Sequence, residues 1–130
     1  MSHEVVRTDR GPAAIGPYSQ AIKLPVGERT LVFVAGQIAL DPGSGELAGG
    51  TAAEQAHRAM QNVRGILEAA GSSLDRVVKT TIFLATMDDF GAVNEAYGSY
   101  FTGAPPARST VAVAGLPKGV DVEIEVLAYC

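Results

Sequence analysis

The sequence predicts a single α+β domain in which a mixed β-sheet carries two helices on one face. Strand-like segments and two segments with helical periodicity follow one another in the order strands, helix, strand, helix, strands. The chain has 130 residues and no internal repeat or low-complexity linker, so we expect residues 1–130 to form one domain.

Two strands are expected before the first helix. Residues 19–24 predict a short strand, and residues 30–37 predict a stronger one that is rich in β-branched and aromatic side chains. The Asp-Pro-Gly-Ser-Gly sequence at 41–45 is typical of a turn. We therefore expect the chain to turn between the second strand and the helix.

The segment from Thr51 to Ala70 has the clearest helical pattern. Thr51 is a suitable N-cap, and Glu54 three residues later completes a capping box. Apolar residues recur at helical spacing and form one stripe, and Gly71 fits the position just beyond a helix end. His57 falls on the opposite face, which we expect to be exposed to water.

The second half of the chain predicts a strand, a helix and two further strands. Residues 77–84 form the first strand, and Asp88 or Asp89 caps the helix that follows. The double proline at 105–106 ends that helix, because proline cannot continue helical hydrogen bonding. The last two strands occupy residues 107–114 and 120–129 and are joined by a turn at 115–119.

One face of the predicted sheet is left uncovered. The strands at 31–34 and 81–84 are apolar on both faces, whereas two helices can cover only one. An uncovered apolar face is typical of an association surface. We therefore expect a homo-oligomer built on the bare side of the sheet.

Composition excludes several classes of protein. Fourteen acidic residues against ten basic ones, with no run of Lys or Arg, exclude the basic stripe of a nucleic-acid binder. No apolar run approaches the roughly 20 residues that span a bilayer. Residues 1–18 contain no apolar h-region, so we expect no secretory signal. A lone cysteine, Cys130, excludes an internal disulfide and predicts a cytoplasmic protein. No metal-binding motif occurs, and the only histidines are His3 and His57.

Arg108 is the first candidate for chemistry. The double proline restricts the approach of the chain, and the neighbours of Arg108 are small or apolar. A guanidinium presents a rigid fork of donors that matches a carboxylate, so Arg108 suits an anchor for a small acid. Residue type alone slightly favours the alternative, a structural salt bridge or a charge on an edge strand.

Glu123 is the second candidate. It alternates with apolar residues in the last strand, which favours the solvated face of an edge strand over a carboxylate that orients water in a cleft. If Ala114 pairs with Val120 across the turn, Arg108 and Glu123 point to opposite faces of the sheet. A slip of one residue would reverse that relation.

Three other residues have two interpretations each. Tyr18 follows a Gly-Pro turn and either walls a pocket or packs in the core. Gly36, inside a strand, marks either a bulge or a close approach of a ligand or backbone. Asn94, on the second helix, is expected to hydrogen-bond a neighbouring loop rather than a ligand.

Five segments, in order and at compatible spacing, extend over nearly the whole chain. They are IGPYSQA at 15–21, AGQI at 35–38, DDFGAVNEAY at 88–97, PPARSTV at 105–111 and GLPKGVDVEIE at 115–125. Together they resemble the RidA family, also called YjgF, the reactive intermediate deaminases.

The resemblance implies a chorismate-mutase-like fold, with a six-stranded sheet carrying two helices, and a homotrimer with three intersubunit clefts. It implies hydrolysis of enamines and imines such as 2-aminoacrylate and 2-iminopropanoate to 2-keto acids and ammonia. Such intermediates arise from pyridoxal-phosphate-dependent dehydratases. The deaminase itself would need no cofactor and no metal.

The resemblance also implies roles for six residues. Arg108 would bind the substrate carboxylate, and Glu123 would position the attacking water and shuttle protons. The other four would bind or enclose the substrate: the backbone amide of Thr110, the carbonyl of Gly36, and the side chains of Tyr18 and Asn94. Two positions depart from the family pattern, which often has Ser where Ala35 stands and Cys where Thr110 stands.

Two other functions remain open. Relatives of the family are often labelled ribonucleases or translation inhibitors, but the acidic balance and the scarcity of histidines argue against RNA cleavage. A non-catalytic ligand-binding or chaperone-like trimer would use the same cleft without turnover. Arg108 suits both an enzyme and a binding protein, whereas its occurrence together with Glu123 favours the enzyme.

The apolar bare face leads to a prediction about assembly. We expect the purified protein to sediment as an oligomer at low concentration, because separating the subunits would expose that face to water. Analytical ultracentrifugation over a dilution series measures this, and a stable monomer throughout would contradict the expectation.

Overall fold

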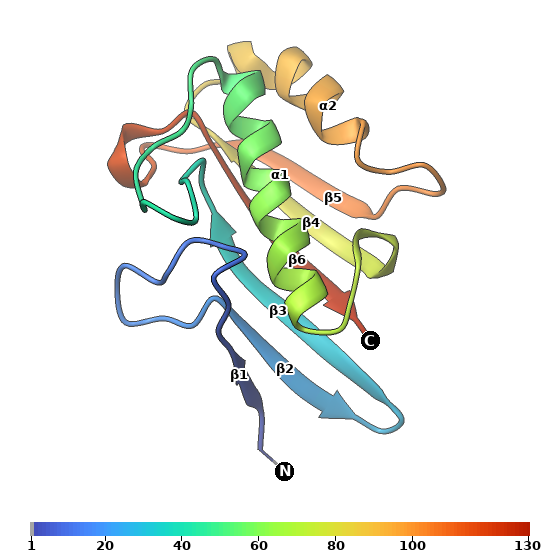
Figure 1. Cartoon of the computed structure of the whole chain (residues 1–130). Helices are drawn as coiled ribbons and strands as arrows, with labels where there is room; N and C mark the ends of the chain where they lie inside the picture. Colours follow the sequence, from blue (N-terminus) through green and yellow to red (C-terminus); the bar gives the residue numbers. More distant parts are fainter. Residues whose placement is uncertain (1) are drawn as a thin grey trace.

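The computed structural model describes residues 2–130 and contains one six-stranded mixed sheet and two α-helices. Helices α1 (Ala52–Ala69) and α2 (Phe90–Gly98) lie over the same face of the sheet (Figure 1). The strands are β1 (Glu4–Val6), β2 (Ala21–Val26), β3 (Arg29–Gln37), β4 (Val77–Leu84), β5 (Ala107–Ala112) and β6 (Val122–Tyr129). The predicted fold class is confirmed.

The strand order is β1-β2-β3-β6-β4-β5, so the last strand of the chain lies in the middle of the sheet. Only β4 and β5 are parallel, and α2 lies between them in the sequence, as a parallel connection requires. Ala112 at the end of β5 and Val122 at the start of β6 both pair with Leu84 of β4. Residues 113–121 therefore carry the chain past β4.

This order corrects two expectations. The pairing of Ala114 with Val120 in a hairpin is wrong, because β4 separates β5 from β6. The description of Glu123 as a residue of an edge strand is also wrong, because β6 pairs with β3 on one side and β4 on the other.

The two faces of the sheet differ sharply in burial. The face toward the helices is closed and holds the core of β3, β4 and β6: Val32, Val34, Thr80, Ile82, Leu84, Val122, Ile124, Val126 and Ala128. On the opposite face Phe33 and Val111 are 43% and 44% exposed. No helix of residues 2–130 covers that face, as the sequence predicted.

Helix α1 begins as predicted. The amide of Glu54 donates to Thr51 Oγ1 at 3.2 Å, and the amide of Thr51 donates to Glu54 Oε1 at 2.8 Å. Gly71 follows the helix with a φ of 87°, a conformation that glycine adopts at little cost. The exposed position expected for His57 is wrong, since its Nδ1 lies 3.1 Å from the Tyr100 hydroxyl and the side chain is half-buried.

The start of α2 differs from the prediction. A short 3₁₀ turn, Met87–Asp89, precedes the helix, and the hydroxyl of Thr86 accepts from the amide of Asp88 at 3.2 Å. Asp89 makes no capping hydrogen bond with its side chain. The three-residue strand β1 was not predicted, since Val6 is its only buried residue and its partner β2 is remote in sequence.

Buried Asn62 of α1 fixes the loop that follows β3. Its Nδ2 donates to the carbonyls of Ile38 and Leu40 at 3.2 and 2.9 Å. Backbone carbonyls left without a donor in a buried position would cost free energy, so this amide holds the loop in one place. Ile38 and Leu40 line a pocket together with Glu123.

Candidate functional site

Three of the predicted residues, Tyr18, Gly36 and Glu123, line one cavity of about 370 Å³. We call this cavity the Glu123 pocket. Glu123 is the only charged side chain in its lining. The remaining lining residues are mostly apolar: Pro12, Ile15, Ala35, Gln37, Ile38, Leu40 and Pro117.

Gly36 lets the Glu123 carboxylate lie against the backbone of β3. The pairing of β3 with β6 shifts register between Val34 and Gln37, which is the bulge that the sequence allowed for. A Cβ atom at Gly36 would overlap the carboxylate of Glu123. The bulge interpretation of Gly36 is confirmed, and the group that approaches closely is the Glu123 side chain. The close approach of a ligand stays a prediction.

The pocket changes the acidity of Glu123. Burial raises the pKa of its carboxyl group above the ordinary glutamate value, and the nearby charge of Glu125 raises it further. Both effects disfavour the ionised form. A carboxyl group with a raised pKa can accept and return a proton closer to neutral pH than an ordinary glutamate.

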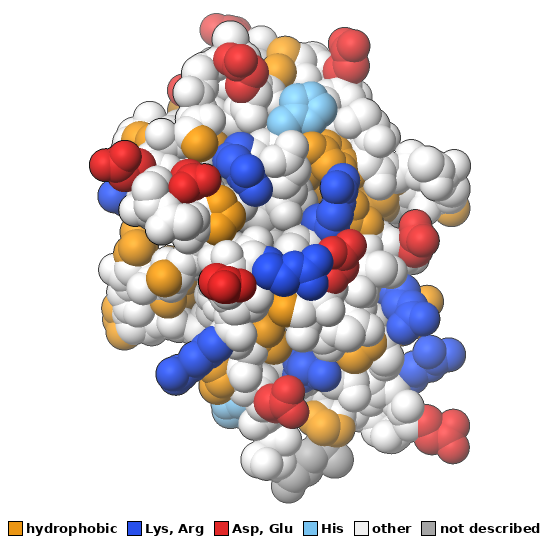
Figure 2. All heavy atoms as spheres, in the orientation of Figure 1, with side chains coloured by type: hydrophobic (Ala, Val, Ile, Leu, Met, Phe, Trp, Pro, Cys, Tyr) orange, Lys and Arg blue, Asp and Glu red, His pale blue; other side chains and the backbone are white. Residues whose placement is uncertain are grey.

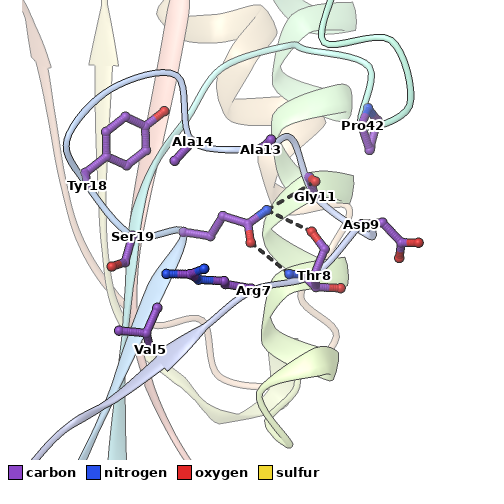
Figure 3. Close-up of a pocket in the computed structure, with 11 residues that line it drawn as sticks. Val5, Arg7, Thr8, Asp9, Gly11, Ala13, Ala14, Tyr18, Ser19 and Pro42 are labelled. Carbon is purple, nitrogen blue, oxygen red and sulfur yellow. Dashed lines mark hydrogen bonds between the residues drawn. The ribbon is translucent and has the colours of Figure 1, made fainter.

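Tyr18 stands at the rim of the pocket rather than in the core. Its ring is 47% exposed, and its hydroxyl accepts a hydrogen bond from the amide of Ile15 at 3.2 Å. Tyr18 also borders a second hollow of about 710 Å³ on the N-terminal loop (Figure 3). The core interpretation of Tyr18 is therefore wrong, and the pocket-wall interpretation fits.

Arg108 lies elsewhere, on edge strand β5. Its Nη1 donates to Asn94 Oδ1 at 2.7 Å, and its guanidinium carbon lies 5.2 Å from the ring centre of Tyr97. The one ion pair among residues 2–130 joins Arg10 and Glu68, so no carboxylate of the described chain neutralises Arg108.

These contacts correct the expectations for two residues. The structural salt bridge considered for Arg108 does not form within the described chain. The loop contact expected for Asn94 is also wrong, because its side chain orients the guanidinium on β5.

Thr110 lies two residues beyond Arg108 in the same strand. It pairs with Ile82, whose side chain is buried beneath the helices, so Thr110 and Arg108 share the helix-bearing face. The hydroxyl oxygen of Thr110 is buried and has no hydrogen-bond partner among the described residues.

The candidate residues thus form two groups on opposite faces of the sheet. Arg108 pairs with Thr80, which pairs with Val126, and Thr80 and Val126 both point into the core. Glu123 is three residues from Val126 and therefore points the other way. The prediction that Arg108 and Glu123 lie on opposite faces is confirmed, although the hairpin pairing of Ala114 with Val120 on which it rested is wrong. Tyr18, Gly36 and Glu123 make one group, and Asn94, Arg108 and Thr110 make the other.

Sequence reasoning assigned no role to Gln20, a buried residue at the start of β2. It lies within the segment IGPYSQA, but a sequence does not show which backbone groups a buried amide will bind. Ala35 was noted only as a departure from a family pattern, and it contributes a small apolar side chain to the pocket wall.

Within residues 2–130, no group of three or more His, Cys, Asp or Glu side chains is placed to hold a metal ion. None of the helices in this range has the length and hydropathy to cross a membrane. On the helix-bearing side, Lys and Arg side chains are interspersed with Asp and Glu (Figure 2).

Comparison with known proteins finds clear relatives. The family described as Endoribonuclease L-PSP matches residues 8–130. A mouse protein named 2-iminobutanoate/2-iminopropanoate deaminase is 50% identical over 125 residues, which cover 96% of this chain and 90% of the mouse protein.

Solved structures agree with this match. RidA from the Antarctic bacterium Psychrobacter sp. has a TM-score of 0.89 and 42% identity over 98% of this chain and 99% of its own. TdcF from E. coli, solved with bound serine, has a TM-score of 0.87 and 39% identity over 96% of this chain and 97% of its own.

The raised pKa of Glu123 predicts a pH-dependent stability. A carboxyl group whose folded-state pKa is raised costs no stability below its ordinary value of 4.5, and the cost grows as pH rises through the folded-state pKa. We therefore expect Glu123→Gln to be more stable than the wild type at about pH 7, with a difference that disappears at about pH 3.5.

Urea unfolding at fixed protein concentration measures this difference. Glu28→Gln, at the exposed turn between β2 and β3, is the control and should follow the wild type at both pH values. If the free energy of unfolding of Glu123→Gln at neutral pH equals that of the wild type, the raised pKa of Glu123 is contradicted.

Proposed function

Because the chain belongs to the Endoribonuclease L-PSP family, which includes RidA, we propose that it is a hydrolytic deaminase of reactive enamines and imines. Its substrates would be 2-aminoacrylate, 2-iminopropanoate and related compounds, and its products 2-keto acids and ammonia. The name of the mouse relative supports this activity. The observation that carries the proposal is the Glu123 carboxylate in an otherwise uncharged pocket with its pKa raised.

In the proposed reaction Glu123 moves protons between water and the substrate nitrogen. It takes a proton from water as the water oxygen adds to the imine carbon, and it delivers that proton to the nitrogen. It then takes the proton of the new hydroxyl group as the carbonyl forms. The carbon–nitrogen bond breaks, the same proton passes to the nitrogen, and ammonia leaves. A group that alternates as base and acid works best with a pKa near the working pH, and burial shifts the pKa of Glu123 upward, in that direction.

Arg108 would hold the substrate carboxylate. A guanidinium that is already oriented by Asn94 and has no ion-pair partner among the described residues can bind a small acid with little reorganisation. The backbone amide of Thr110 would assist it. The carbonyl of Gly36 would hold the imine nitrogen near Glu123, and Tyr18 would close the pocket.

The proposed cleft needs two subunits. Arg108 and Glu123 point to opposite faces of their own sheet, so one small substrate would reach both only if a neighbouring copy supplies one of them. The bare face, with exposed Phe33 and Val111, offers a surface for that contact. We therefore propose a homotrimer with three intersubunit clefts.

The proposal extends to the cellular setting. Pyridoxal-phosphate-dependent dehydratases would produce the substrates, whereas the deaminase would use no cofactor of its own. The lone cysteine, Cys130, requires no oxidising compartment, which supports a cytoplasmic location.

Two alternatives make different demands. A ribonuclease, as the family description suggests, would need proton-transfer groups near a basic surface. His57 is instead hydrogen-bonded to Tyr100, and on the face shown in Figure 2 the basic side chains are interspersed with acidic ones. A non-catalytic ligand-binding trimer would need Arg108 but not the raised pKa of Glu123.

The decay of 2-aminoacrylate generated by a serine dehydratase tests the deaminase directly. We expect the wild type to accelerate the decay and Arg108→Ala to abolish the effect, because the substrate loses its anchor. Glu123→Gln should lower the rate by a factor of about 100 or more, because the proton carrier is lost.

Arg76→Ala and Glu28→Gln, both at exposed positions outside the candidate residues, serve as matched controls and should retain activity. If the wild type does not accelerate the hydrolysis of several amino-acid-derived imines, the non-catalytic ligand-binding trimer is favoured. Full activity in Glu123→Gln would reject the assigned proton carrier.

RNA cleavage in metal-free buffer tests the ribonuclease. We expect none beyond contamination that further purification removes, because acidic residues outnumber basic ones and His57 is hydrogen-bonded to Tyr100. Cleavage that survives repeated purification and disappears in Glu123→Ala would contradict this expectation.

A further inference from the structure

Gln20 is a buried glutamine between the N-terminal loop and β2. Its Oε1 accepts from the amide of Thr8 at 2.9 Å, and its Nε2 donates to the carbonyls of Thr8 and Gly11 at 2.9 and 3.2 Å (Figure 3). The same Nε2 donates to the carbonyl of Pro12 at 2.8 Å. One side chain thus satisfies four backbone groups that lie 8 to 12 residues earlier in the chain.

The backbone of Gln20 reaches the opposite wall of the pocket. Its carbonyl accepts from the amide of Ala35 at 2.9 Å, within the bulge of β3. Ala35 precedes Gly36, against whose backbone the Glu123 carboxylate lies. Gln20 therefore bonds both to the N-terminal loop and to the strand beneath Glu123.

The bond to Pro12 closes the loop from residue 12 to residue 20. Pro12, Ile15 and Tyr18 of this loop all line the Glu123 pocket. Ile15 and Tyr18 are 58% and 47% exposed, so packing within the chain contributes little to holding them. Loops whose ends lie close together are usually packed by their own side chains. With Ile15 and Tyr18 exposed, the hydrogen bonds at the ends of this loop carry more of that role.

The other side of the loop is fixed on α1. A Cβ at Gly65 would overlap the carbonyl of Arg10, and one at Gly11 would lie 2.7 Å from Ile66 Cδ1. The segment before Pro12 therefore packs closely against α1. The part of the loop that carries Ile15 and Tyr18 is more exposed, and Gln20 lies at its far end.

We propose that Gln20 is a positioning residue for the deaminase reaction, because it joins the two walls of the Glu123 pocket and limits the access of bulk water to the carboxylate. Gln20 does not line that pocket and acts through the loop and through β3. The kinetic part of this inference rests on the proposed function. The part that concerns the enclosure of Glu123 does not rest on the proposed function, because that enclosure is a structural property of the chain.

Loss of the amide has two expected effects. The loop that carries Tyr18 loosens, so the substrate is held less well. Water reaches Glu123, so the main cause of its raised pKa weakens and the pKa falls toward the ordinary glutamate value.

The test compares Gln20→Met with the wild type, using the full-length protein in its native assembly. Met preserves the length of the side chain but removes every hydrogen bond that the amide makes. Carbon-13 NMR of the glutamate carboxyl groups follows the titration of Glu123, and imine hydrolysis gives KM and kcat. We expect the Glu123 midpoint to move to lower pH and KM to rise about tenfold, with a smaller change in kcat.

Two further variants separate positioning from stability. Ser72→Ala removes a buried hydrogen bond to the Tyr129 carbonyl at the far end of β6, and it should lower stability without moving the Glu123 midpoint or KM. Gln20→Asn keeps an amide that is one methylene too short to reach all its partners. If Gln20→Met does not fold, Gln20→Asn should show the same two changes in milder form.

The outcomes are distinct. A folded Gln20 variant with the wild-type Glu123 midpoint and wild-type KM would overturn the proposal and leave Gln20 a purely structural residue. If no imine is hydrolysed but the Glu123 midpoint still falls in Gln20→Met, the deaminase proposal fails while the enclosure of Glu123 by Gln20 holds.

Discussion

A β-sheet directs alternate side chains to opposite faces, and this constraint divides the candidate site into two halves. Arg108 lies on the helix-bearing face of edge strand β5, and Glu123 lies on the bare face of central strand β6. Each half is locally complete, since Asn94 orients the arginine and Gly36 makes room for the carboxylate. Under the proposed function a small acid needs both halves, so that function requires association of the chains through the face that the helices leave open.

The half of the candidate site that contains Glu123 lowers the folding stability of the chain. Burial and the neighbouring charge of Glu125 both disfavour the ionised carboxylate of Glu123. A fully exposed glutamate without a charged neighbour would experience neither effect. Positions that depart from the usual rules of folding are often functional. The loop held by Gln20 and the loop held by Asn62 keep the pocket in shape around this unfavourable group.

Local patterns in the sequence predicted much of the fold. The capping box of α1 and the alternation of β6 depend on residues close in the chain, and both are confirmed. Strand order depends on contacts between remote segments, so the central place of β6, and with it the true setting of Glu123, was missed. The cap by Thr86 and the bonds of Gln20 were missed because backbone conformation decides them. The roles of Arg108 and Glu123 came from a family resemblance, since alternation alone favoured a solvated carboxylate.

Subunit complementation tests the shared cleft most directly. Arg108→Ala and Glu123→Gln proteins, each inactive alone, are unfolded and refolded together in equal amounts. A cleft built by two subunits predicts recovery of about a quarter of the wild-type activity, because each mixed trimer regains one intact cleft. Refolding Arg108→Ala with the double variant should restore nothing. A mixture of the two single variants that stays as inactive as its components would contradict the account.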